Sequence, residues 1–74
     1  MTIQEAFETI KTKILRVYPT LTISFDEDTV DDEYWISIHN STVYFSDEFL
    51  GIVYEINTEL LWPNGLYNVF VSNG

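Results

Sequence analysis

The stretch from Leu21 to Phe45 constrains the fold most strongly, because apolar and polar residues alternate along it on both sides of an acidic segment. Two apolar sets show this alternation: Leu21, Ile23 and Phe25 before the acidic segment, and Tyr34, Ile36 and Ile38 after it. Since successive side chains of a β-strand point to opposite faces, each run is typical of a half-buried strand. The acidic segment is therefore expected to be a loop at the tip of a sheet.

A third strand is predicted from Thr42 to Phe45, joined to the second strand by a hairpin turn at Asn40 and Ser41. Asparagine tolerates the positive φ that such turns require. A turn at this point would place the apolar side chains of the second and third strands on the same face, in register. The three strands would then form an antiparallel meander.

Apolar residues outside this stretch recur with the 3.6-residue period of amphipathic helices. The first stripe contains Ile3, Phe7, Ile10, Ile14 and Val17, and the second contains Phe49, Val53, Ile56 and Leu60. Thr2 and Glu5 form a capping box that predicts the start of the first helix, and Pro19 predicts its end. Ser46 is a good N-cap for the second helix, which is expected to end before Pro63 to Gly65.

A last strand is predicted over residues 66 to 71, with Tyr67, Val69 and Val71 as the inward set. The chain is thus expected to form one α+β domain over residues 1–74, in the order α-β-β-β-α-β. The antiparallel meander and the C-terminal strand would form one sheet, with both helices on one of its faces. A right-handed crossover would lay the last strand parallel to the third, beside either the first or the third strand.

The charge is large and unevenly distributed, with a net charge of −9 and all three basic residues between Lys11 and Arg16. Such a surface repels nucleic acids and anionic membranes, because binding them requires Lys and Arg side chains. Direct nucleic-acid binding and membrane binding are therefore not expected, and a basic protein surface is the partner that the charge favours. The chain has no cysteine, which excludes disulfides and thiolate zinc sites. No run of residues is apolar and long enough for a signal peptide or a membrane span, so a cytoplasmic location is expected.

The predicted acidic loop contains six carboxylates in eight positions: Asp26, Glu27, Asp28, Asp31, Asp32 and Glu33. The pattern is not an EF-hand, because the sixth position has no glycine and the twelfth is Ser37 instead of glutamate. Three interpretations remain: a solvated loop, a docking surface for a basic protein, and a looser site for a divalent cation. No metal or other cofactor is expected.

A second acidic group is predicted on the outer face of the second helix, where Glu48, Glu55 and Glu59 align with Gly51. None of these glutamates has a basic residue three or four positions away, so their repulsion is not relieved within the helix. A surface selected only for stability would have such a partner, which favours a role in binding. The spacing is on the scale of successive phosphates and is compatible with mimicry of a nucleic acid.

The opposite face of the predicted sheet is polar except for three aromatic residues, Trp35, Tyr44 and Phe70. They are expected either to shield the sheet by packing across strands or to form the interface of a homodimer. His39 is expected to be a surface side chain. No catalytic residue is expected, because acids at loop tips and helix surfaces do not form the apolar pocket that shifts the pKa of a catalytic carboxyl.

The function predicted from these features is that of a small acidic binding protein without enzymatic activity. Its two acidic groups would occupy a basic surface, such as that of a nucleic-acid-handling protein, and so inhibit it. The alternative is a structural or oligomer-forming domain that uses the aromatic face, with acidity serving only solubility.

Overall fold

The computed structural model describes residues 1–74. The first helix, α1 (Ile3–Val17), begins at the predicted capping box. The Thr2 hydroxyl accepts a hydrogen bond from the Glu5 N–H at 3.1 Å, and the Glu5 carboxylate accepts one from the Thr2 N–H at 3.1 Å. Two of the N–H groups that a helix start leaves without partners are satisfied in this way. The helix ends where the Tyr18 N–H donates to the Ile14 carbonyl.

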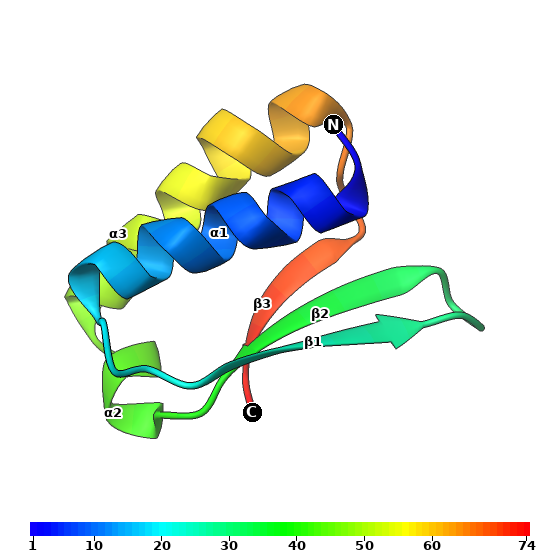
Figure 1. Ribbon diagram of the computed structural model, residues 1–74. Helices are drawn as coiled ribbons and strands as arrows, with labels where there is room; N and C mark the ends of the chain where they lie inside the picture. The colour runs from blue at the N-terminus through cyan, green and yellow to red at the C-terminus, as the bar shows by residue number, and fades with distance from the viewer.

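Two strands follow α1 as predicted and form an antiparallel hairpin of β1 (Ile23–Asp28) and β2 (Glu33–Ile38). Ile23 pairs with Ile38 and Phe25 pairs with Ile36, so the apolar sets of both strands share one face. This register confirms the inward assignment that the period-two pattern gave for these strands. The acidic segment forms the tip of the hairpin, which projects beyond the helices (Figure 1).

The predicted third strand is wrong, because Ser41–Tyr44 form a short helix, α2. Asn40 does not occupy a hairpin turn; its side-chain oxygen accepts a hydrogen bond from the Val43 N–H at 3.1 Å, and its backbone is extended. Asparagine is among the best N-cap residues, and this local bond competes with strand pairing. Tyr44 consequently lies outside the sheet and packs against Phe45 and Phe49.

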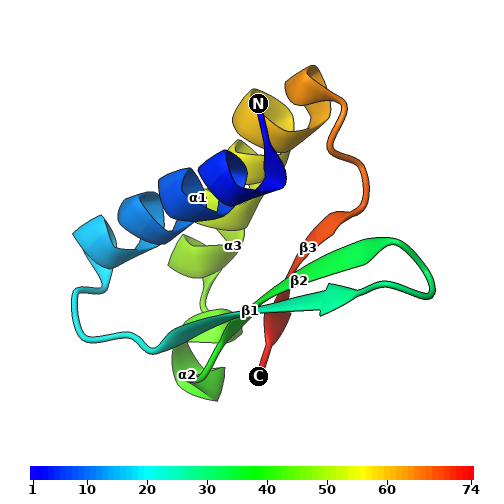
Figure 2. The same cartoon turned by 45° about the vertical axis from the view of Figure 1, so that its right-hand side comes forward.

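The last strand, β3 (Val69–Asn73), pairs in parallel with β2 and not beside either of the two strands expected. The sheet therefore has three strands in the order β1-β2-β3. With no third meander strand, the edge of β2 opposite β1 is available to β3. The placement of the two long helices on one face of the sheet is confirmed (Figures 1 and 2). A helical crossover is also present, but it connects β2 to the parallel strand β3, and not the predicted third strand to the last. Tyr67 precedes β3 and is 69% exposed, so its inward assignment is wrong.

The second long helix changes type along its length, from α3 (Asp47–Glu55) to the π-helix η1 (Ile56–Leu61) and a 3₁₀ turn, η2 (Trp62–Asn64). Ser46 caps its start by accepting from the Phe49 N–H at 3.2 Å. The buried residues are spaced by seven and then by five, namely Phe49, Ile56 and Leu61. A spacing of five is one turn of a π-helix. Leu61 is therefore buried in place of Leu60, which the regular 3.6-residue period had selected.

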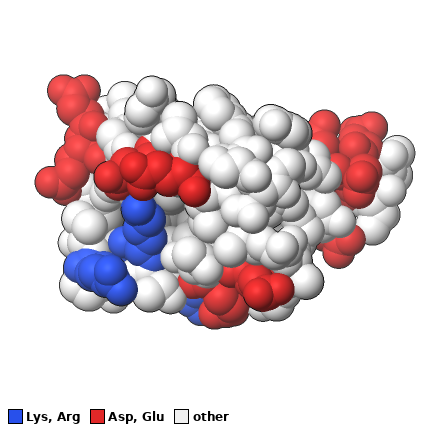
Figure 3. All heavy atoms as spheres, turned by 90° about the horizontal axis from the view of Figure 1, so that it is seen from above, with Lys and Arg blue, Asp and Glu red and all other residues white.

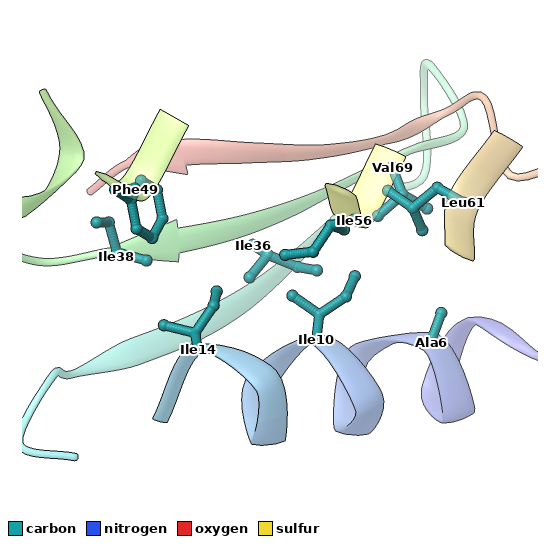
Figure 4. Packing of buried hydrophobic residues seen from close by; sticks show 9 residues of the cluster. All are labelled: Ala6, Ile10, Ile14, Ile36, Ile38, Phe49, Ile56, Leu61 and Val69. Carbon is teal, nitrogen blue, oxygen red and sulfur yellow. The ribbon is translucent and has the colours of Figure 1, made fainter. Parts of the chain in front are cut away.

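Nine apolar side chains form one core between the two layers (Figure 4). Those of α1 point toward the sheet and toward the second long helix. The members are Ala6, Ile10 and Ile14 from α1, Ile36, Ile38 and Val69 from the sheet, and Phe49, Ile56 and Leu61 from the second long helix. The observed order α-β-β-α-α-β thus confirms the expected small α+β domain.

Candidate functional site

The tip of the β1–β2 hairpin is built by local hydrogen bonds of its own acidic side chains. The Asp28 carboxylate accepts from the Val30 N–H at 3.0 Å and from the Asp31 N–H at 3.2 Å, as in an Asx turn. Asp32 then reverses the chain in the left-handed region, with a φ of 54°. Aspartate is one of the few residues that enter this region at low cost. The sequence of the loop therefore determines a defined turn.

A contact from a distant part of the chain holds the base of this tip. Asn68 donates through its side-chain amide to the Asp32 carbonyl at 2.7 Å, and its own carbonyl accepts from the Tyr34 N–H at 2.9 Å. From the sequence, the alternation in the last strand predicts no more than an outward-facing Asn68. Because its partners lie more than thirty positions away, no local pattern could have identified this role.

The six acids of the tip have no basic partner in the molecule, since the only ion pair joins Lys13 and Glu55. They are exposed apart from Asp28 and Glu33, which are half-buried. Desolvation raises the pKa of the neighbouring Tyr34 phenol, and the negative charges of Asp32 and Glu27 raise it further. At the apex the Val30 side chain is 90% exposed. The tip is thus an uncompensated acidic surface around one apolar residue.

The glutamates of the second long helix differ, because Glu48 has a partner at the C-cap of α1 and Glu55 has one within α1. The Tyr18 hydroxyl donates to the Glu48 carboxylate at 2.6 Å, and this bond raises the pKa of Tyr18. The Lys13 ammonium lies 3.5 Å from the Glu55 carboxylate. Glu59 has no ion pair and lies in η1, outside the regular α-helix. Spacing within one helix could not show these partners, since they come from a different helix.

The structure does not bring the two acidic groups together. Glu48 contacts Tyr18, which precedes the start of β1, whereas the acidic tip follows the end of β1. The whole length of β1 therefore runs between Tyr18, which contacts Glu48, and the tip. Figure 3 shows acidic side chains at opposite ends of the face seen from above, with uncharged surface between them over its upper part and a further acidic patch at its lower edge.

The outer face of the sheet is not covered by any helix (Figure 2). Trp35 and Phe70 pack across β2 and β3 with ring centroids 4.9 Å apart, which confirms cross-strand aromatic packing for these two residues. Tyr44 does not join them, because it belongs to α2. Beside them the hydroxyls of Ser37 and Ser72 lie within hydrogen-bond distance, at 3.0 Å.

His39 is exposed, as expected, and its Nε2 lies 2.8 Å from the Ser24 hydroxyl. A serine and histidine pair becomes a nucleophile and base when a third group orients the imidazole. No carboxylate bonds the other ring nitrogen. No group of three or more His, Asp or Glu side chains is arranged to hold a metal ion. This pair is therefore not a recognisable catalytic site.

Comparison with protein-family models, curated proteins and solved structures finds no match to this chain. None of its helices combines the length and the apolar character needed to cross a membrane.

Proposed function

We propose that this protein is a small non-enzymatic binding protein that docks its acidic hairpin tip on a basic surface of another protein. The observation behind the proposal is that six carboxylates project on a defined turn with no basic group of the molecule paired to them. Carboxylates already paired within the fold contribute less to association than those free to meet a partner's Lys and Arg side chains. Of the two acidic groups, the tip therefore supports the proposal better than the helix.

Charge and apolar contact have separate roles in this proposal. Complementary charge speeds association and favours basic partners over others, whereas affinity depends on a few buried anchors. Val30 is the apolar side chain placed to be such an anchor, because it lies at the apex and is surrounded by the acids. The natural target of this chemistry is a protein that binds nucleic acid, whose basic surface the tip would occupy and so inhibit.

The experiment compares two variants that have the same net charge. In the tip variant, Glu27→Gln, Asp31→Asn and Asp32→Asn remove three charges and retain Asp28, which builds the turn. In the helix variant, Glu8→Gln, Asp47→Asn and Glu59→Gln remove three charges elsewhere. Both change the formal net charge from −9 to −6, because each loses three acids.

Immobilised wild type and both variants are incubated with an extract of the source cell at low salt and eluted with a salt gradient. The proposal expects basic proteins that the wild type and the helix variant retain and the tip variant releases at lower salt. Association rates with a purified retained protein should then fall several-fold for the tip variant alone. Equal retention by the two variants would show that net charge, and not the tip, governs binding, and would refute the proposal.

A further inference from the structure

The two edges of the sheet differ in how they are protected. Both β1 and β3 are edge strands, since the sheet order is β1-β2-β3. β1 ends in Asp26, Glu27 and Asp28, and charged residues of this kind prevent edge-to-edge pairing. β3 has the sequence Val-Phe-Val-Ser-Asn and no charged residue. An uncharged edge strand is a ready template for another strand.

The backbone groups of β3 that remain free can be identified from the groups that are bonded. Asn68 accepts from Tyr34, and the Gly74 N–H donates to the Ile38 carbonyl, so even-numbered residues of this segment face β2. Alternate residues of a parallel strand direct their backbone groups to the same side. Val69, Val71 and Asn73 therefore direct their N–H and C=O groups away from β2, and no hydrogen bond is formed to them outside the sheet.

The segment around this edge is suited to a second molecule of equal charge. No Asp, Glu, Lys or Arg occurs from Leu60 to Gly74, although the chain has a net charge of −9. Phe70, the second residue of β3, is 38% exposed and extends the aromatic packing of Trp35 toward the edge. Two copies can approach here without bringing acidic side chains into the contact.

We propose that β3 pairs antiparallel with β3 of a second copy, about a two-fold axis at Val71, to form a continuous six-stranded sheet. In this register Val71 pairs with its counterpart and Val69 pairs with Asn73 of the second copy, which uses every free backbone group of the strand. The acidic tip lies near the start of β3, where Asn68 contacts Asp32. Antiparallel pairing consequently sets the two tips at opposite ends of the sheet, where their repulsion is smallest.

The dimer is weak and its salt dependence is distinctive. Pairing of one five-residue strand with another buries less than the roughly 1,200 Å² at which stable interfaces begin, so a transient dimer is expected. Because both copies are acidic, salt screens their repulsion and strengthens the dimer. Docking of the tip on a basic partner shows the opposite response, so the dimer and the proposed function can fail independently.

The test measures self-association of the full chain by sedimentation velocity from micromolar to millimolar concentration, at low and high salt. Val71→Pro removes an N–H that points away from β2, whereas Glu27→Pro makes the same change at the open edge of β1. The proposal expects Val71→Pro to weaken the dimer at least tenfold and Glu27→Pro to leave it within twofold. Near-UV circular dichroism of the two tryptophans verifies the fold of each variant.

If Val71→Pro does not fold, Asn73→Pro tests the dimer in its place, because Asn73 is exposed at the strand end and outside the core. It should weaken the dimer several-fold. Amide hydrogen exchange should show protection of Val69, Val71 and Asn73 that rises with protein concentration. A protein that stays monomeric at millimolar concentration and high salt overturns the proposal, and so does a dimer that a folded edge variant leaves intact or that Glu27→Pro weakens equally.

Discussion

The twelve acids of this protein fall into two equal groups with different relations to the fold. The helical group consists of Glu5, Glu8, Asp47, Glu48, Glu55 and Glu59, and the tip group consists of the six acids of the hairpin. In the helical group Glu5 caps α1, Glu48 accepts from Tyr18 and Glu55 pairs with Lys13. In the tip group only the Asp28 side chain accepts hydrogen bonds. Acids that support the fold and acids that are free of contacts within it can thus be told apart.

The largest expected difference is in the free energy of unfolding, between a substitution in the helical core and one in the tip. Ile56→Ala leaves a cavity in the core and should lower the free energy of unfolding by about 2–5 kcal/mol. Val30→Ala at the apex of the tip should change it by less than about 0.5 kcal/mol, because the side chain contacts mainly water. Urea denaturation followed by tryptophan fluorescence measures both. Comparable losses would mean that the tip belongs to the cooperative core.

A smaller effect is expected from the cap of α1. Thr2→Ala removes the hydroxyl that accepts from the Glu5 N–H and should cost about 1 kcal/mol. Thr2→Ser keeps that hydroxyl and is the matched control, with a loss of no more than a few tenths of a kcal/mol. Urea denaturation at neutral pH distinguishes them. An equal loss from both substitutions would assign the effect to the threonine methyl group and not to the cap.

The capping box of Thr2 and Glu5 should stabilise the protein more at neutral pH than at acidic pH. The hydrogen bond from the Thr2 backbone, and then that from its side chain, hold the pKa of Glu5 below its ordinary value of 4.5. The stabilisation is therefore present in full above pH 4.5 and is lost as the pH falls through the lower native pKa. Glu5→Gln should reduce the melting temperature at pH 7 and reduce it less at pH 3. A constant difference between pH 3 and pH 7 would contradict this linkage.

The hydrogen bond between Tyr18 and Glu48 should instead lose its stabilising effect at alkaline pH. The hydrogen bond to Glu48 raises the pKa of Tyr18 above its ordinary value of 10.0. Its stabilisation is present below pH 10 and is lost as the pH rises through the native pKa. Wild type should thus melt above Tyr18→Phe at pH 8, and the two melting temperatures should converge at higher alkaline pH. A gap that persists there would indicate a packing effect.

The smallest effect on stability is expected from the tip charges. The tip variant of Glu27→Gln, Asp31→Asn and Asp32→Asn should gain a few tenths of a kcal/mol at low salt, because repulsion among exposed carboxylates is relieved. Added salt should remove this gain. The helix variant of equal charge should not show this gain, because it also removes the favourable charge of Asp47 from the first turn of α3. A loss of stability in the tip variant would mean that these acids also support the fold.

Much of the fold follows from local patterns, and the failures occur where two local rules compete. The capping box at Thr2, the hairpin strands and the N-cap at Ser46 were predicted because each depends on neighbours along the chain. At Asn40 the sequence permits both a turn and a helix cap, and the cap forms. At Leu61 a π-turn replaces the assumed α-helical period. Neither choice is decided by periodicity alone.

The candidate site was predictable in position but not in its contacts. The acidic composition of the tip is evident from the chain, whereas the anchor at Asn68 and the pairing of Lys13 with Glu55 join distant segments. The sequence predicts that both acidic groups occupy one basic surface of a partner. That Glu48 contacts Tyr18, which precedes β1, while the tip follows β1 is a property of the tertiary structure.

The π-helix η1 has a consequence for how the chain can change in length. Ile56 and Leu61 are five positions apart, which is the span of the π-helical hydrogen bond and one more than the four positions that an α-helix needs to bring the next side chain to the same face. Loss of one residue here would restore an α-helical turn and leave both buried side chains in place. A one-residue deletion within residues 57–60 would therefore be absorbed as a change of helix type, whereas one within β2 would reverse which side chains face the core.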